Sequence, residues 1–269
     1  MTVTIQTILD STHEALQRAE LFYGHGSDNA WDEAVFLVLS ACGLELDVGD
    51  EVLARIVTDA EKAQIDDWLQ KRIEKHLPLP YITHQAWFCG LPFYVDERVL
   101  VPRSPFAEWI NKQFEPWCRA DDLKQILEIG TGSGCIAIAT ALALPDAKVD
   151  ACDISVDALQ VATKNIAEYK LQDRVKLFES DVYAHIPEKK YDLIISNPPY
   201  VSADEMNELP EEYLQEPQSG LEADNDGMAI VDKILKDAAK YLQPKGYLMV
   251  EVGYSQAIFT EHYPEFYVI

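Results

Sequence analysis

The chain has 269 residues, of which 22 are Lys or Arg and 46 are Asp or Glu, so its formal net charge is −24. A composition that is 48% hydrophobic and 25% charged excludes a disordered protein, and the length predicts two domains or one elaborated α/β domain. Such an acidic surface repels phosphate backbones and attracts cationic partners, so we expect no direct nucleic-acid partner.

Neither a membrane span nor a metal site is expected. No apolar run approaches the roughly 18–20 residues of a membrane span, and residues 1–17 lack the basic start and apolar centre of a signal peptide. The five cysteines are odd in number, no pair has C-x-x-C spacing, and the six histidines are dispersed. We therefore expect a cytoplasmic, reduced and metal-free protein.

The first 85 residues predict a helical domain. Apolar residues recur at helical spacing through residues 5–16, 31–39 and 65–73, and a Gly-, Ser- and Asn-rich turn separates the first two segments. Pro78 and Pro80 are expected to end this pattern.

Residues 86–105 predict a linker. Two short aromatic-rich runs flank Gly-Leu-Pro within residues 87–95, which is typical of a β-hairpin. The sequence VLVPRSP at residues 99–105 continues as an extended connector.

From about residue 125 onward, strands and helices are expected to alternate, which indicates βαβ units and an α/β fold with a doubly wound, mostly parallel sheet. Ligands bind beyond the carboxyl ends of the strands in such sheets. We predict strands at 126–129, 147–152, 175–178, 191–196 and 247–252, helices at 135–144, 156–169 and 228–242, and a turn at 244–246.

The first expected strand runs into a glycine-rich turn, LEIGTGSGC at residues 127–135. Glycines let the backbone approach a ligand, and the following helix start offers free N–H groups. The turn lacks the Gly-Lys-Ser/Thr of a phosphate loop, although its spacing also fits a loose dinucleotide fingerprint. Glu128 favours a cationic ligand, such as the ammonium of S-adenosylmethionine, because a pyrophosphate gains nothing from a carboxylate. The candidate cofactor-binding residues here are Glu128, Gly130, Thr131, Gly132, Ser133 and Gly134.

Two further acids follow strand ends. Asp153 comes about 20 residues after the glycine turn, where an acid commonly accepts hydrogen bonds from both ribose hydroxyls. The alternative is an aspartate that stabilises a helix start. Asp181 is a candidate acceptor for the adenine amino group or else a solvated loop acid. Ile154 and Val182 follow these acids, and Val182 is expected to cover the adenine ring.

The fourth expected strand ends in Asn197-Pro198-Pro199-Tyr200. Two prolines lock φ and remove two N–H donors, so the Asn197 side chain and the Pro198 carbonyl are held as acceptors that can grip both hydrogens of a planar –NH2 group. Tyr200 can stack on that group. Fixing the hydrogens aims the nitrogen lone pair at an incoming methyl group. These four residues are the catalytic candidates, and a proline-braced loop is the structural alternative.

Together, the glycine turn, Asp153 and NPPY resemble the amino-nitrogen methyltransferases that use S-adenosylmethionine. The linker FCGLPFYVDERVLVPRSP is similar to that of the protein-glutamine N(5)-methyltransferases, and the resemblance runs from about Leu21 onward. It implies a helical substrate-recognition domain at 1–85, a β-hairpin linker at 86–105 and a Rossmann-like catalytic domain at 106–269.

Two substrates are known in this family: the glutamine of the Gly-Gly-Gln motif in release factors, and a glutamine in large-subunit ribosomal protein L-three. The release-factor type usually carries Pro-Arg-x-Glu/Asp in the linker, whereas this chain has Pro-Arg-Ser-Pro at residues 102–105. Residues 22–34 and 86–90 resemble the ribosomal-protein type, and a basic ribosomal protein suits a charge of −24. The resemblance therefore implies L-three as substrate, with the release factor as the alternative.

The family's sheet normally ends with an antiparallel pair of strands, after the helix that follows Val252. This sequence stops at residues 266–269, where only the first of the two could begin. We therefore expect the C-terminal strands to be incomplete and a strand edge to be exposed.

Three other functions stay open at this stage. A nucleobase amino-methyltransferase shares the Asn-Pro-Pro-aromatic logic, but it needs a basic groove. A nicotinamide-dependent oxidoreductase is supported only by the glycine turn. A non-catalytic binding module predicts a broken motif, whereas the motifs here are intact.

Overall fold

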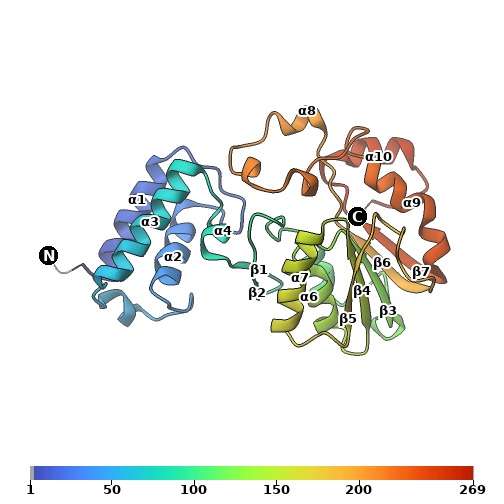
Figure 1. Cartoon of the computed structure of the whole chain (residues 1–269), viewed down its shortest axis with the longest axis horizontal. Coiled ribbons are helices and arrows are strands. Elements are labelled where there is room, and N and C mark those ends of the chain that lie inside the picture. The colour runs from blue at the N-terminus through green and yellow to red at the C-terminus, as the bar shows by residue number, and fades with distance from the viewer. Residues whose placement is uncertain (1–2, 269) are drawn as a thin grey trace. The chain divides into compact units, whose positions relative to one another are not determined.

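The computed structural model describes residues 3–268. The chain forms two compact units (Figure 1). The first contains residues 1–86 together with the short segment 210–215, and the second contains residues 87–209 and 216–269. Among residues 3–268, no helix has both the length and the apolar character needed to cross a membrane.

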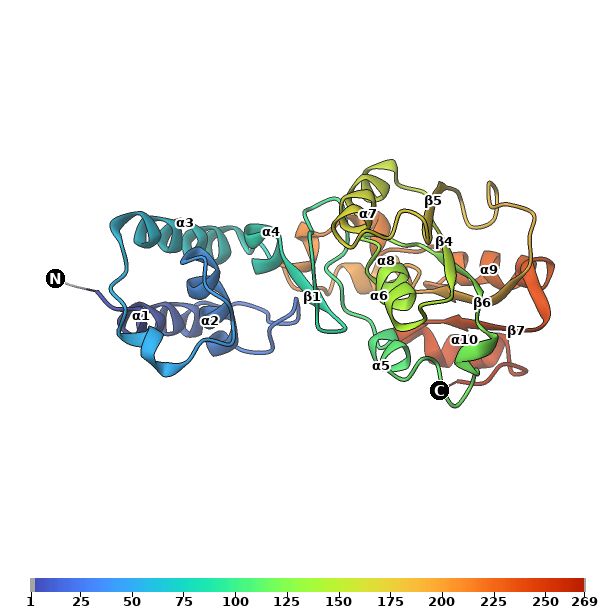
Figure 2. The ribbon, with the colours of Figure 1, turned by 90° about the horizontal axis from the view of Figure 1, so that it is seen from below.

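The first unit is helical, and the three helices expected there are present. Each begins at a side-chain cap, and the third has a full capping box between Thr58 and Glu61. Pro80 does not end the helical structure as expected, because it lies in the first turn of a short helix, where no backbone hydrogen bond is lost. The helices are α1 (Ile5–Arg18), α2 (Ala30–Ala41), α3 (Asp59–Lys75) and α4 (Leu79–Thr83), with a 3-10 turn at Asp50–Ala54; α3 and α4 follow one another in Figure 2.

A buried ionic cluster holds segment 210–215 in this unit. The Arg72 guanidinium donates to the carboxylate of Glu33, to that of Glu212 at 2.9 Å and to the carbonyl of Phe22 at 2.9 Å. All three charged side chains are buried. Glu212 also accepts a hydrogen bond from the backbone N–H of Phe22 at 2.9 Å. The cluster therefore joins α2, α3 and residues far along the chain.

The expected hairpin is a two-stranded sheet of β1 (Ala86–Phe88) and β2 (Leu91–Phe93). Its two turn residues, Cys89 and Gly90, both have positive φ, at 52° and 73°. This is the conformation that matches the twist of paired strands in tight hairpins.

The second unit is built on a five-stranded sheet of order β5-β4-β3-β6-β7 with parallel pairing throughout. This confirms the predicted Rossmann-like fold. The strands are β3 (Gln125–Ile129), β4 (Lys148–Asp153), β5 (Val175–Glu179), β6 (Tyr191–Ser196) and β7 (Leu242–Val250).

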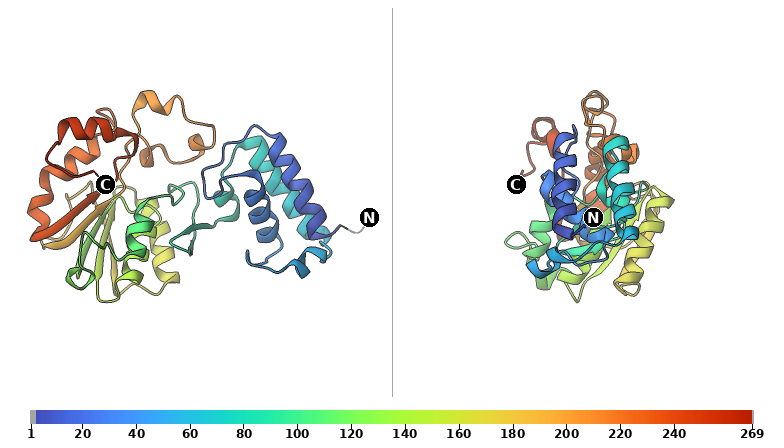
Figure 3. Two further views of the ribbon diagram at one scale, coloured as in Figure 1. Left: turned by 180° about the vertical axis from the view of Figure 1, so that it is seen from behind. Right: turned by 90° about the vertical axis from the view of Figure 1, so that its left-hand side faces the viewer.

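Helices cover both faces of this sheet (Figure 3). Alternate residues such as Ile126 and Val149 pack with α6 (Cys135–Ala143) and α7 (Val156–Glu168) on one face, while Leu127 and Ile194 pack with α9 (Ala229–Tyr241) on the other. The helices of this unit are α5 (Phe106–Asn111), α6 (Cys135–Ala143), α7 (Val156–Glu168), α8 (Ala203–Met206), α9 (Ala229–Tyr241) and α10 (Gln256–His262).

The last strand differs from expectation. The predicted turn at 244–246 lies inside β7, which accommodates it by a shift of register against β6, and the strand ends at Val250 rather than at residue 252. Residues 266–268 form no strand, and Ile269 lies outside the described residues. Within residues 3–268, β7 is therefore the edge of the sheet.

The register of the strands brings the predicted motifs to one edge. Ile129 pairs with Cys152 on one side and with Ser196 on the other, and Ser196 pairs in turn with Val250. The glycine turn, Asp153 and Asn197 each come directly after these residues. They therefore meet at the carboxyl edge of the sheet, where ligands bind in folds of this kind.

Candidate active site

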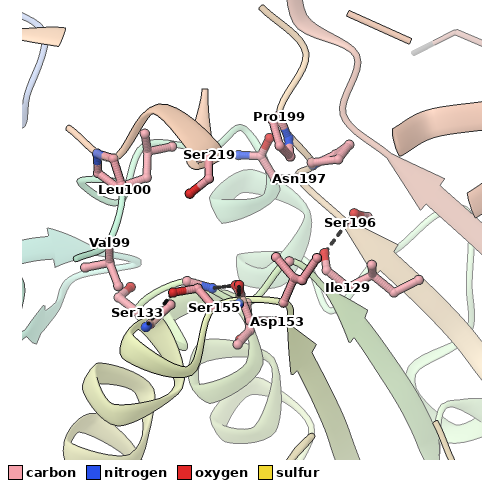
Figure 4. A pocket seen from close by; sticks show the side chains of 18 of the residues that line it. Val99, Leu100, Ile129, Ser133, Asp153, Ser155, Ser196, Asn197, Pro199 and Ser219 are labelled. Atoms are coloured by element: carbon pink, nitrogen blue, oxygen red, sulfur yellow. Dashed lines mark hydrogen bonds between the residues drawn. The ribbon is translucent and has the colours of Figure 1, made fainter. Parts of the chain in front are cut away.

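A cavity of about 310 Å³ opens at this edge (Figure 4). Its volume lies at the lower end of the range of small-molecule sites. Its walls come from the glycine turn, from the ends of β4 and β6, from the linker and from the segment before α9. Of the predicted cofactor residues, all except Gly134 line the cavity. They are Glu128, Gly130, Thr131, Gly132, Ser133, Asp153, Ile154, Asp181, Val182 and Asn197.

The glycine turn combines an open face with a packed one. Gly132 has a φ of 52°, and a side chain there would meet nothing within 4 Å, so its backbone is accessible to a ligand. Gly134 has a φ of 82°, and a Cβ there would lie 3.2 Å from the Cβ of Ala162 in α7. Gly134 therefore serves the packing of helices, which explains its absence from the cavity wall.

Glu128 is a buried acid in the cavity wall without a cationic partner among residues 3–268. It is 1% exposed and accepts a hydrogen bond from Thr131 Oγ1 at 2.6 Å. Burial, with a smaller contribution from the charge of Asp153, raises its pKa to about 8. Among the ion pairs of residues 3–268, none includes Glu128. A cationic group bound in the cavity would supply the missing charge.

Asp153 joins two loops at the cavity wall. Its carboxylate accepts the backbone N–H of Gly132 at 2.9 Å and that of Ser155 at 2.9 Å. Burial raises the pKa of Asp153, and these backbone hydrogen bonds oppose the rise. The acid therefore stabilises the start of α7, as the structural alternative expected, and also lines the cavity, as the ribose-binding hypothesis requires.

Three further candidate cofactor residues, Asp181, Val182 and Ile154, differ from each other in exposure. Asp181 lines the cavity but is about half exposed and pairs with Lys233 Nζ at 2.9 Å, a contact that the sequence did not suggest. Val182 is buried and has a φ of 52°. Ile154 is 64% exposed at the cavity rim.

The Asn-Pro-Pro turn faces the same cavity. Ser196, which precedes it, is buried and donates to the carbonyl of Ile129 at 2.8 Å, so the end of β6 is fixed beside the glycine turn. Asn197, Pro198 and Pro199 all line the cavity. Figure 4 shows Asn197 and Pro199 on the side of Ser219, across from Asp153. The amide oxygen of Asn197 can therefore act on a group held in the cavity.

Tyr200 lies differently from its three neighbours. Tyr200 is not among the described residues that line the cavity. Its hydroxyl donates to Glu251 Oε1 at 3.0 Å, and its ring lies against Gly253. The stacking of Tyr200 on a substrate amide stays a prediction.

The sequence did not identify two acids near the site. Glu216 accepts hydrogen bonds from the guanidinium of Arg103 at 2.6 and 3.0 Å. Glu251 follows Val250 at the end of β7, the same kind of position that singled out Asp153. The predicted strand at 247–252 places this acid inside the strand, so the sequence pattern does not mark it as a candidate.

Comparison with known proteins identifies the family. Residues 118–260 match the model of the methyltransferase small domain, which is more than half of the chain. The uL3 glutamine methyltransferases of Neisseria gonorrhoeae and Neisseria meningitidis are 44% and 43% identical over 97% of this chain, and the matches cover 88% and 86% of those proteins. The chain belongs to this methyltransferase family.

The fold of the methyltransferase also occurs in a solved structure of low sequence identity. The hMettl16 catalytic domain, solved with hairpin 1 of the MAT2A 3′UTR, is 17% identical, with a TM-score of 0.51 over 87% of this chain and 82% of that one. At this identity the likeness concerns the fold alone.

Proposed function

We propose that this methyltransferase transfers a methyl group from S-adenosylmethionine to the side-chain amide nitrogen of a glutamine in ribosomal protein uL3. Relatives at 44% and 43% identity carry this activity in their names. The observation that carries the proposal is that the Asn197-Pro198-Pro199 turn lines the same cavity as the glycine turn and Glu128. A donor and an acceptor can therefore meet in one enclosed space.

The cavity wall suits S-adenosylmethionine. Glu128 offers a buried carboxylate with no lysine or arginine partner among residues 3–268, which suits a ligand that carries an ammonium and a sulfonium. Asp153 is in place to accept from ribose hydroxyls, Gly132 exposes backbone, and Asp181 with Val182 borders the expected adenine position. When bound, S-adenosylmethionine supplies an electrophilic methyl group.

The Asn-Pro-Pro turn is proposed to hold the acceptor. An amide nitrogen is a weak nucleophile because its lone pair is delocalised into the carbonyl. The Asn197 side-chain oxygen and the Pro198 carbonyl accept the two amide hydrogens, so the lone pair is directed toward the methyl group. As the nitrogen–methyl bond forms, the bond between the methyl group and the sulfonium sulfur breaks, and the nitrogen releases one hydrogen as a proton. The prolines fix the backbone that presents these acceptors. Catalysis then comes from positioning and from stabilising the transition state by hydrogen bonds.

We assign substrate selection to the helical domain at residues 1–85, with residues 86–105 as linker and residues 106–269 as the catalytic domain. The net charge of −24 favours a basic ribosomal protein through long-range attraction. We place the reaction in the cytoplasm, before RNA covers the substrate.

The test uses the purified chain, S-adenosylmethionine and separately purified uL3 and release factor. We expect mass spectrometry to find a methyl group on one glutamine of uL3, with the release factor unmodified and with nuclease treatment of the substrate having no effect. Asn197→Ala is expected to lower turnover by about a hundredfold or more while calorimetry still detects S-adenosylmethionine binding. Unchanged turnover in this variant would contradict the assigned role.

A further inference from the structure

Three side chains from distant parts of the sequence form one hydrogen-bonded chain beside the active site. The Tyr200 hydroxyl donates to Glu251 Oε1 at 3.0 Å, and the Ser104 hydroxyl donates to Glu251 Oε2 at 2.7 Å. Tyr200 ends the NPPY motif, Ser104 belongs to the linker, and Glu251 follows β7. Both oxygens of one carboxylate are thus used to join the motif to the linker.

Tyr200 lies in close contact with the backbone of two glycines. A Cβ on Gly253 would overlap its ring, and a Cβ on Gly227 would overlap its carbonyl oxygen. That carbonyl also accepts the Ser255 hydroxyl at 3.1 Å. Two glycines therefore make room for a tyrosine whose hydroxyl must reach Glu251.

The linker segment that carries Ser104 is also held in place by hydrogen bonds. The guanidinium of Arg103 forms two hydrogen bonds with Glu216, at 2.6 and 3.0 Å, and Glu216 accepts the backbone N–H of Val101 at 2.9 Å. Glu216 and Val101 are buried. Two-pronged pairs of this kind hold both partners in a defined orientation. Ser104 is therefore presented to Glu251 from a rigid segment.

Glu251 itself is partly buried and is not among the residues that line the cavity. Burial raises its pKa, while the hydrogen bonds from Ser104 and Tyr200 and the charge of Arg103 oppose that rise. Its two carboxylate oxygens accept from Tyr200 and from Ser104, so its contact with the NPPY motif is the hydrogen bond to Tyr200.

We propose that Glu251 is a positioning residue for methyl transfer, which fixes Tyr200 against the linker and thereby sets the acceptor groups of Asn197 and Pro198. The proposal rests on the function proposed above. Because the two prolines between Asn197 and Tyr200 have fixed φ, the segment has few ways to take up a displacement of Tyr200 without moving Asn197. A misplacement of about 1 Å at a reacting centre is enough to cost roughly a hundredfold in rate.

The test compares Glu251→Ala with Glu251→Gln. The alanine variant loses both hydrogen bonds, and we expect kcat on uL3 to fall about ten- to a hundredfold, with the S-adenosylmethionine Kd unchanged. In the glutamine variant the amide oxygen can accept from Tyr200 and the amide –NH2 can donate to Ser104, so kcat is expected to stay near that of the unaltered protein. Glu261→Ala, an exposed acid on α10, serves as the matched control.

A double-mutant cycle with Tyr200→Phe separates positioning from folding. If Glu251 acts through the tyrosine hydroxyl, Glu251→Ala added to Tyr200→Phe costs little more than Tyr200→Phe alone. Strictly additive effects, a glutamine variant as slow as the alanine variant, or full kcat in the alanine variant would each overturn the proposal.

A second measurement does not depend on turnover. The measurement is NMR of protein that carries isotope-labelled tyrosine. The ring resonance of Tyr200, assigned by its loss in Tyr200→Phe, is expected to shift or broaden in Glu251→Ala and not in Glu251→Gln. An unchanged signal in the alanine variant would overturn the proposal. If the unaltered protein fails to methylate uL3 while this signal responds as expected, the proposed function fails and the positioning of Tyr200 by Glu251 stands.

Discussion

Glu33 and Glu212 in the helical unit and Glu128 in the catalytic unit are buried carboxylates with different kinds of partner. In the helical unit, Glu33 and Glu212 share the guanidinium of Arg72. In the catalytic unit, Glu128 is as deeply buried but has a hydroxyl partner, and its pKa rises to about 8. A buried acid that is paired with a cation serves the fold, whereas one left without a cation in a cavity wall is in place to bind a cationic ligand.

The largest expected effect comes from breaking the paired cluster. Arg72→Met removes the cation and leaves two buried carboxylates together, so the free energy of unfolding is expected to fall by about 3–5 kcal/mol at neutral pH. Urea unfolding measures this change. Arg18→Met provides the control, because the Arg18–Glu14 pair on α1 is exposed and its loss is expected to change little. Equal effects of the two variants would show that the buried cluster contributes no more to stability than an exposed ion pair.

Unlike Arg72→Met, Glu128→Gln is expected to weaken ligand binding without lowering the free energy of unfolding. The pKa of Glu128 is about 8 in the folded protein, against 4.5 for an unperturbed glutamate, so the stability contributed by this group is present below about pH 4.5 and is lost as the pH rises through 8. The glutamine variant lacks this loss and is expected to be at least as stable at pH 8. Its affinity for S-adenosylmethionine is expected to fall by roughly ten- to a hundredfold, because a hydrogen bond to a charged group is lost.

This prediction can be tested by measuring the S-adenosylmethionine affinity of both proteins by calorimetry between about pH 6 and 9, a range that includes the pKa of Glu128. Ionisation of Glu128 favours the cationic ligand, so the affinity ratio of the unaltered protein to the glutamine variant is expected to rise with pH. Titration of the ligand itself cancels in this ratio. A ratio that does not change with pH would show that Glu128 does not bind the cationic part of the ligand.

The smallest effect is expected at the exposed pair of Asp181 and Lys233. Their side chains are about half exposed, so Lys233→Ala is expected to change the free energy of unfolding by less than about 1 kcal/mol. If Asp181 accepts from the adenine amino group, freeing it from the lysine leaves the S-adenosylmethionine Kd unchanged or lower. A Kd that rises as much as in Glu128→Gln would contradict the distinction between exposed and buried acids.

The sequence predicted the parts of the site that depend on local pattern. Strands β3, β4 and β6 are short, mostly apolar runs, and the candidate ligand-facing residues lie at the end of the strand, as Asp153 does, or directly after it, as Asn197 does. The parallel register of an α/β sheet then brings these ends together. A local pattern plus one rule of topology therefore placed the glycine turn and the Asn-Pro-Pro turn in one cavity.

The parts that the sequence did not predict depend on contacts between distant residues. Arg72 and Glu212 are 140 positions apart, and Ser104 and Glu251 are 147 apart. Nothing in the local sequence of either acid distinguishes it from the other acids of a chain that has 46 of them. The position of Glu251 also depended on where β7 ends, and strand boundaries are poorly defined by periodicity alone.

The most direct test of the central claim is mass spectrometry of uL3 after incubation with S-adenosylmethionine and either the unaltered methyltransferase or its Asn197→Ala variant. The account predicts one methylated glutamine with the unaltered protein and essentially none with the variant, although both bind S-adenosylmethionine. Equal methylation by the two proteins, or an unmodified uL3 beside a methylated release factor, would contradict it.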